Sequence, residues 1–229
     1  MPADARPLPL ESPSSAIERE QATPVGTRIC AGVPTRLTCA EALDQLKAGN
    51  ARFLAGTPQS EPYGPRVGDF ARDHSPFAVV LGCSDSRVPI ETVFDQVPGN
   101  VFVVRVAGNF LNDHNLGSIE FAVEVLGIKL IVVLGHGGCG AVTAALAYVR
   151  DGIEQRGHIQ GIVNAVTPAV QAARGFPGDW LENAIAQNVA INVNAVTSTS
   201  NIVSQQIEAG EVQVIGGIYN VSTGWVAFS

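Results

Sequence analysis

Residues 77–87 read FAVVLGCSDSR, and residues 130–141 read LIVVLGHGGCGA. Each stretch opens with a continuous apolar run, which is typical of a strand buried on both faces, and ends in glycine and polar residues. Residues 101–106 form a similar run, and residues 118–126, closed by Gly127, have a helical pattern. A strand, helix, strand order predicts a parallel sheet with crossover helices.

The segments before and after these strands predict further helices. Residues 38–41 match a capping box that opens a helix ending near Gly56. Helices are also expected over residues 139–150 and 157–173, where Pro168 starts or kinks part of the segment. From Asp179 the length of the segment favours a helix, although its β-branched residues favour a strand.

A last strand is expected over residues 211–219, followed by a turn at 222–224 and a short partner strand at 225–228. We therefore predict an α/β fold with a central, mostly parallel β-sheet, an antiparallel edge extension, flanking helices and an N-terminal arm. Residues 1–36 are expected to be flexible or arm-like, with a short helix around 16–20, and residues 37–229 to form a single domain. Residues 58–66 are expected to form a loop.

Composition limits the class of protein. The 229 residues are 46% hydrophobic and only 15% charged, which favours one well-buried domain with subunit contacts. The net charge of -7 and the pI near 5.0 argue against a nucleic-acid partner. We found no apolar run of the roughly 18 residues that a membrane span needs, and no signal-peptide core. We expect a cytoplasmic protein without a membrane partner, with a removed export signal as the alternative.

The four cysteines fall into two groups. Cys30 and Cys39 are expected to be buried and inert, because a chain of this length needs no disulfide framework. Cys83 follows the first strand, and Cys139 comes three residues after His136, at the end of another strand. The carboxyl ends of parallel strands meet at one edge of a sheet, so these residues can share one crevice.

Two thiolates and one imidazole suit tetrahedral zinc, with a fourth position left open as in catalytic sites. Thiolates argue against magnesium and calcium, which prefer oxygen ligands. A phosphate-binding loop is excluded, because no Gly-Lys-Ser/Thr follows the glycines around His136. We expect one Zn²⁺ per subunit.

Four segments resemble the β-class carbonic anhydrases: CSDSR at 83–87, RVAGN at 105–109, SIE at 118–120 and GHGGCG at 135–140. The likeness extends over residues 38–228. The resemblance implies a zinc site formed by Cys83, His136 and Cys139, with Asp85 and Arg87 as a catalytic dyad. It also implies a homodimer or homotetramer in which the N-terminal arm wraps the partner.

The resemblance predicts reversible hydration of carbon dioxide to bicarbonate and a proton. Zinc lowers the pKa of bound water, so that hydroxide is available near neutral pH. Asp85 would accept the hydrogen bond of this hydroxide, and a bidentate pair with Arg87 would keep Asp85 ionised and off the metal. One alternative is hydrolysis of carbonyl sulfide or carbon disulfide on the same fold. Another is a non-catalytic zinc- or bicarbonate-binding assembly protein, against which Asp85 and Arg87 argue.

Some positions depart from the family pattern. His74 stands where the family usually has a glutamine that helps to bind substrate across the subunit interface. We assign His74, with Gly140, to substrate binding or proton relay, with a solvent-facing loop histidine as the alternative. Val80 replaces the tryptophan of a bicarbonate-regulated type, although Arg105 matches that type's arginine. The unregulated type is therefore favoured, and closure of Asp85 onto zinc at low pH stays open.

Overall fold

The computed structural model describes residues 37–59 and 74–229. Its sheet has the strand order β2-β1-β3-β4-β5. The first four strands are parallel, and β5 runs antiparallel to β4. The predicted α/β fold, with a mostly parallel sheet and an antiparallel edge, is therefore confirmed. The strands are β1 (Ala78–Gly82), β2 (Val101–Arg105), β3 (Leu130–His136), β4 (Gln213–Tyr219) and β5 (Val226–Phe228).

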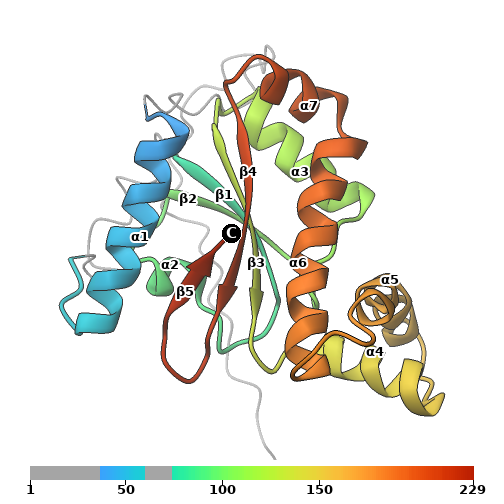
Figure 1. The fold of residues 1–229 in the computed structure, drawn as a ribbon. Helices are drawn as coiled ribbons and strands as arrows, with labels where there is room; N and C mark the ends of the chain where they lie inside the picture. Colours follow the sequence, from blue (N-terminus) through green and yellow to red (C-terminus); the bar gives the residue numbers. More distant parts are fainter. Residues whose placement is uncertain (1–36, 60–73) are drawn as a thin grey trace, which may run out of the picture. The chain divides into compact units, whose positions relative to one another are not determined.

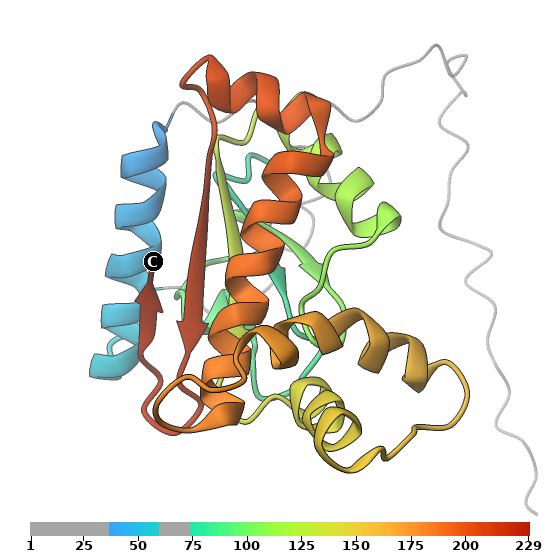
Figure 2. The ribbon, with the colours of Figure 1, turned by 45° about the vertical axis from the view of Figure 1, so that its right-hand side comes forward.

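Helices cover both faces of the sheet (Figure 1). Helices α1 and α2 lie on one face, and α3, α6 and α7 lie on the other. Figure 2 shows α4 and α5 packed near the start of α6, beside the end of the sheet to which the parallel strands point. The helices are α1 (Cys39–Ala55), α2 (Ile90–Val93), α3 (Asp113–Glu124), α4 (Gly140–Asp151), α5 (Ile159–Ala172), α6 (Trp180–Thr199) and α7 (Asn201–Glu208).

Strands β1 and β3 consist of apolar residues and glycine up to His136, the last residue of β3, because each strand alternates its side chains between two hydrophobic cores. In β1, Ala78 and Val80 join the core under α1 and α2, whereas Val79 and Leu81 join the core under α3 and α6. Every residue of β1 and β3 is buried. Burying a valine, leucine or isoleucine side chain stabilises the fold by about 1.5–3 kcal/mol relative to leaving it exposed.

Helix α1 begins and ends as the sequence predicts. The Thr38 hydroxyl accepts a hydrogen bond from the Glu41 amide at 3.3 Å, and the Glu41 carboxylate accepts one from the Thr38 amide at 2.8 Å. Gly56 caps the other end with φ 66°. At Gly49 the helix comes so close to α2 that an added Cβ would lie 1.7 Å from the Phe94 carbonyl oxygen.

Helix α6 lies directly on β3, where a Cβ at Gly135 would come within 2.6 Å of Val189. Its β-branched residues Val189 and Val196 are buried, so packing on the sheet outweighs their preference for strands. The predicted long helix ends at Ser200, whose hydroxyl accepts from the Val203 amide at 3.1 Å and starts α7. Neither this break nor the short helix α2 was predicted.

Three local predictions need correction: the start of α3, Pro168 as a helix start, and the burial of Cys39. Helix α3 begins at Asp113 instead of residue 118, because the Asn112 side chain accepts hydrogen bonds from the amides of His114 and Asn115. Pro168 lies inside α5 and does not start it. Cys39 is half-buried, since its place in the first turn of α1 leaves it at the margin of the core. Its thiol donates to the Lys129 carbonyl at 3.3 Å.

The predicted N-terminal arm (1–36), with its short helix and Cys30, lies outside the described residues, as does most of the predicted 58–66 loop. Within the described ranges, we found no helix that is both long and apolar enough to cross a membrane.

Candidate metal centre

Three side chains meet at the carboxyl ends of two neighbouring strands. Strands β1 and β3 pair in parallel, with Gly82 opposite Leu134. Cys83 directly follows β1, His136 is the last residue of β3, and Cys139 is the N-cap of α4. Their ligand atoms all lie within 4.8 Å of one another, and the two Sγ atoms are 3.9 Å apart. The structure therefore brings together the three residues that the sequence singled out.

The imidazole of His136 is oriented as a metal ligand requires. Its Nδ1 lies 3.1 Å from the Gly137 carbonyl oxygen, which can only accept a hydrogen bond, so Nδ1 carries the proton. The Nε2 atom then holds a lone pair. It is buried and has no hydrogen-bond partner among the described residues. A buried polar atom without a partner costs about 1–3 kcal/mol, which a metal bound at Nε2 would offset.

The two thiols differ in acidity. The pKa of Cys83 is lowered, mainly by its hydrogen bond with the Cys139 thiol, and the Gly108 amide, which donates to its sulfur at 3.2 Å, lowers it further. The pKa of Cys139 is raised by its hydrogen bond with Cys83 and by burial. One thiolate therefore forms readily in this pair, and thiolate is the form that binds metal. The Gly108 contact was not predicted, since sequence rules do not place a loop amide on a sulfur.

Asp85 and Arg87 form a bidentate pair beside the three ligands. The guanidinium donates from Nε to Oδ1 at 3.0 Å and from Nη2 to Oδ2 at 2.7 Å, and the Arg87 amide donates to Oδ1 at 2.9 Å. These bonds hold the pKa of Asp85 well below its usual range. The Asp85 Oδ2 is 3.9 Å from the His136 Nε2. An ionised carboxylate therefore stands next to the candidate metal ligands.

Arg105, at the end of β2, points toward the backbone of the same turn. Its Nε donates to the Cys83 carbonyl at 2.8 Å, and its Nη2 donates to the Asp85 carbonyl at 2.7 Å. One side chain thus fastens the residue that offers a sulfur and the residue that offers a carboxylate. From the sequence, Arg105 was singled out only for its match to the arginine of a bicarbonate-regulated type. Its bonds to the two carbonyls were not predicted.

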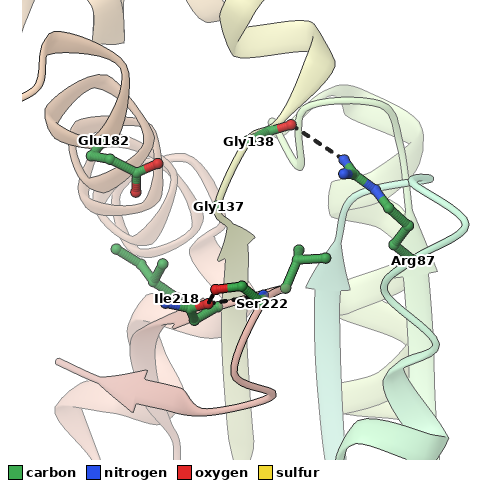
Figure 3. A pocket seen from close by; sticks show the side chains of 8 residues that line it. Arg87, Gly137, Gly138, Glu182, Ile218 and Ser222 are labelled. Atoms are coloured by element: carbon green, nitrogen blue, oxygen red, sulfur yellow. Dashed lines mark hydrogen bonds between the residues drawn. The ribbon is translucent and has the colours of Figure 1, made fainter.

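A cavity of about 420 Å³ adjoins this site through Arg87 (Figure 3). Arg87 reaches the rim of the cavity and donates to the Gly138 carbonyl at 3.3 Å, and Glu182 lies on the opposite side. The bond to Gly138 ties the charged pair to the turn between His136 and Cys139. The remaining lining residues are Gly137, Ile218, Asn220, Val221 and Ser222.

His74 and Gly140 lie differently from the other predicted site residues. His74 precedes β1 and Gly99 precedes β2, and the Cβ of His74 lies beside Gly99. His74 therefore lies at the amino-terminal end of these parallel strands. The ligands lie at the opposite edge. Within one chain His74 is therefore separated from them, and its predicted role requires a second subunit. Gly140 is the first residue of α4, next to Cys139, and is exposed.

Comparisons with known proteins show which proteins this chain is similar to. A family model described as carbonic anhydrase matches residues 78–226. Carbonic anhydrase 2 of Mycobacterium tuberculosis is 41% identical over 181 residues, covering 78% of this chain and 87% of the relative. A solved β-carbonic anhydrase of Coccomyxa, in complex with acetazolamide, superposes with a TM-score of 0.62 and is 27% identical, covering 81% of this chain and 80% of the other.

The chain belongs to the β-carbonic anhydrase family. A carbonic anhydrase of Mycolicibacterium smegmatis is also 41% identical, over 182 residues that cover 79% of this chain and 88% of the relative. A β-carbonic anhydrase structure from Sordaria macrospora, described as tetrameric, has a TM-score of 0.60 and 25% identity, covering 72% of this chain and 86% of the other. The family resemblance that the motifs predicted is confirmed.

Proposed function

We propose that this β-carbonic anhydrase family member catalyses the reversible hydration of carbon dioxide to bicarbonate and a proton. One Zn²⁺ per subunit would be held by Cys83, His136 and Cys139. The observation that carries the proposal is the buried cluster of these three ligand atoms, with the ionised Asp85 beside it.

The residues present fit zinc. Two sulfurs and one imidazole nitrogen are a donor set that Zn²⁺ accepts, with one position left for water or substrate. The Nε2 of His136 is buried and, among the described residues, lacks another partner. When bound, zinc supplies Lewis acidity that activates water near neutral pH.

The charged pair provides the orientation that hydration needs. Asp85 accepts a hydrogen bond from the reacting water and so directs an oxygen lone pair toward the carbon of carbon dioxide. This role requires an acceptor-only carboxylate, and the fork of Arg87 keeps Asp85 ionised and fixed. Arg105 holds the backbone on both sides of Ser84, so the turn that carries Asp85 cannot drift from the ligands.

The test is a stopped-flow assay of carbon dioxide hydration on protein whose zinc content is measured. We expect one zinc per chain and hydration that is lost on treatment with a chelator and regained with Zn²⁺. The variant Cys83→Ser should lose zinc and activity together, whereas Asp85→Ala should keep zinc and lose activity. A zinc-loaded wild-type chain without hydration activity would contradict the proposal and favour a non-catalytic role.

We also propose that the chain forms a homodimer or homotetramer. Its family includes tetrameric members, and the predicted role of His74 at a site requires a second subunit. Light scattering after size exclusion should give the mass of two or four chains. A monomer with full activity would contradict both the assembly and the role of His74.

A further inference from the structure

Two asparagine side chains are buried on α6, on the part of the helix that faces the loop after β2. Asn188 is 2% exposed and Asn192 is 5% exposed. Burying an amide is unfavourable unless its polar atoms are hydrogen-bonded, and an apolar residue would suit most buried helix positions better. The hydrogen-bond partners of these two amides therefore indicate why α6 has asparagine, and not an apolar residue, at these buried positions.

Both amides hold the loop of residues 106–111. The Asn188 Nδ2 donates to the Gly108 carbonyl at 2.8 Å. The Asn192 Oδ1 accepts from the Leu111 amide at 2.7 Å. The two side chains are also joined, because the Asn192 Nδ2 donates to the Asn188 Oδ1 at 3.2 Å and to its carbonyl at 2.7 Å. The pair thus clamps the loop at two points.

Gly108 connects this clamp to the candidate metal ligands. Its amide donates to the Cys83 Sγ at 3.2 Å while its carbonyl accepts from Asn188. Its φ is +85°, a value that disfavours other residues, and an added Cβ would lie 3.0 Å from both Ala141 and Val166. The residue is therefore wedged between α4 and α5, and Asn188 of α6 holds its carbonyl.

We propose that Asn188 is a positioning residue for the metal site, which aims the Gly108 N–H at the sulfur of Cys83 by holding the Gly108 carbonyl. A hydrogen bond to a ligating sulfur fixes the direction of its lone pairs and reduces the charge that it donates to the metal. Groups that hold metal ligands in this way tune metal affinity about 10- to 100-fold. The inference rests on the proposed function for the identity of the metal.

If Asn188 had a purely structural role, replacing it would lower the stability of the fold without changing metal affinity. Asn50 offers a matched control, because it is also buried, at 3% exposed. Its Nδ2 donates to the carbonyls of Val93 and Gly224, and its Oδ1 accepts from the Val226 amide. It lies on α1, which covers the other face of the sheet, and makes none of the contacts to the Gly108 loop.

The test compares the full-length variants Asn188→Leu and Asn50→Leu with the wild type. Leucine keeps a similar volume and removes the amide. Both variants should unfold at lower temperature. Only Asn188→Leu should shift the sulfur-to-metal absorption band of the Co²⁺-loaded protein and weaken Zn²⁺ affinity, measured against a competing chelator, by about 10- to 100-fold. Asn192→Leu removes the bond to the Leu111 amide and the contact to Asn188 but no bond to Gly108, so it should cause a smaller shift.

Unchanged Zn²⁺ affinity and an unshifted Co²⁺ band in Asn188→Leu would overturn the inference, while hydration by the wild type would leave the proposed function standing. Equal shifts in Asn188→Leu and Asn50→Leu would also overturn it. A wild-type chain that bound neither metal would overturn both proposals. If Asn188→Leu does not fold, the wild type loaded with NMR-active cadmium provides the measurement. Coupling between the Gly108 amide proton and the metal is expected, and its absence would overturn the inference.

Discussion

Replacing Arg105 with methionine removes a guanidinium and keeps most of the apolar stem. The variant loses the half-buried bond to the Cys83 carbonyl and the exposed bond to the Asp85 carbonyl. The first is worth about 1.5 kcal/mol, as expected for a charged donor. The second is worth about 0.5 kcal/mol, because solvent screens an exposed contact. The turn that carries Asp85 therefore loses about 2 kcal/mol of restraint, which corresponds to a factor of about 30.

We expect Arg105→Met to lower kcat/KM for carbon dioxide hydration about 30-fold, by stopped flow, with zinc content unchanged. Arg105→Lys should lose less, because its ammonium can still donate to one carbonyl. Arg150→Met is the control, since Arg150 pairs with its neighbour Asp151 at the end of α4. Full activity in zinc-loaded Arg105→Met would refute the reasoning that this side chain shapes the site.

Three further changes test other parts of the structure. Arg87→Lys should keep zinc and lose most hydration activity, because lysine cannot form the fork to Asp85; full turnover would rule out the dyad. Gly49→Ala should lower the free energy of unfolding in urea by about 1–3 kcal/mol, because its Cβ would meet the carbonyl at the end of α2. The same change at Gly117, where the space is open, should not destabilise the protein. Burial raises the pKa of Tyr219, so the unfolded chain loses this proton first and stability falls as the pH rises past about 10. Tyr219→Phe should flatten this alkaline loss in urea titrations, and an unchanged slope would contradict the assignment.

The central strands and the meeting of Cys83, His136 and Cys139 were predictable because both depend on short stretches of sequence. An apolar run such as residues 130–134 can be satisfied only by burial on both faces, and helical segments that can provide this burial occur both before and after it in the chain. Parallel pairing then places Cys83 and His136 at the same edge. The predicted capping box at Thr38 was correct for a similar reason, since all of its bonds lie within one turn.

Features that depend on distant segments were not predictable. The break at Ser200 occurs inside a continuous helical pattern, and the Ser200 hydroxyl also donates to Glu120 on α3, a contact that only the folded chain creates. The hydrogen bond from Arg105 to the Cys83 carbonyl and the bond from the Gly108 amide to the Cys83 sulfur each join residues more than 20 positions apart. Segment 105–109 could be picked out of the sequence as a motif, but no sequence rule predicts the hydrogen bonds that its residues make.

The pairing of β1 with β3 has a practical consequence for anyone who prepares this protein. Cys83 and His136 are brought to the same end of the sheet by the ladder that sets Gly82 opposite Leu134. A slip of one residue would turn the side chains of β3 to the opposite faces and take the imidazole of His136 away from the sulfur of Cys83. Misfolded or mispaired chains would therefore lack the complete cluster even if every cysteine were intact. If the proposed zinc is bound at this cluster, the ratio of metal to chain in a preparation measures the fraction of molecules whose strands are in the correct register.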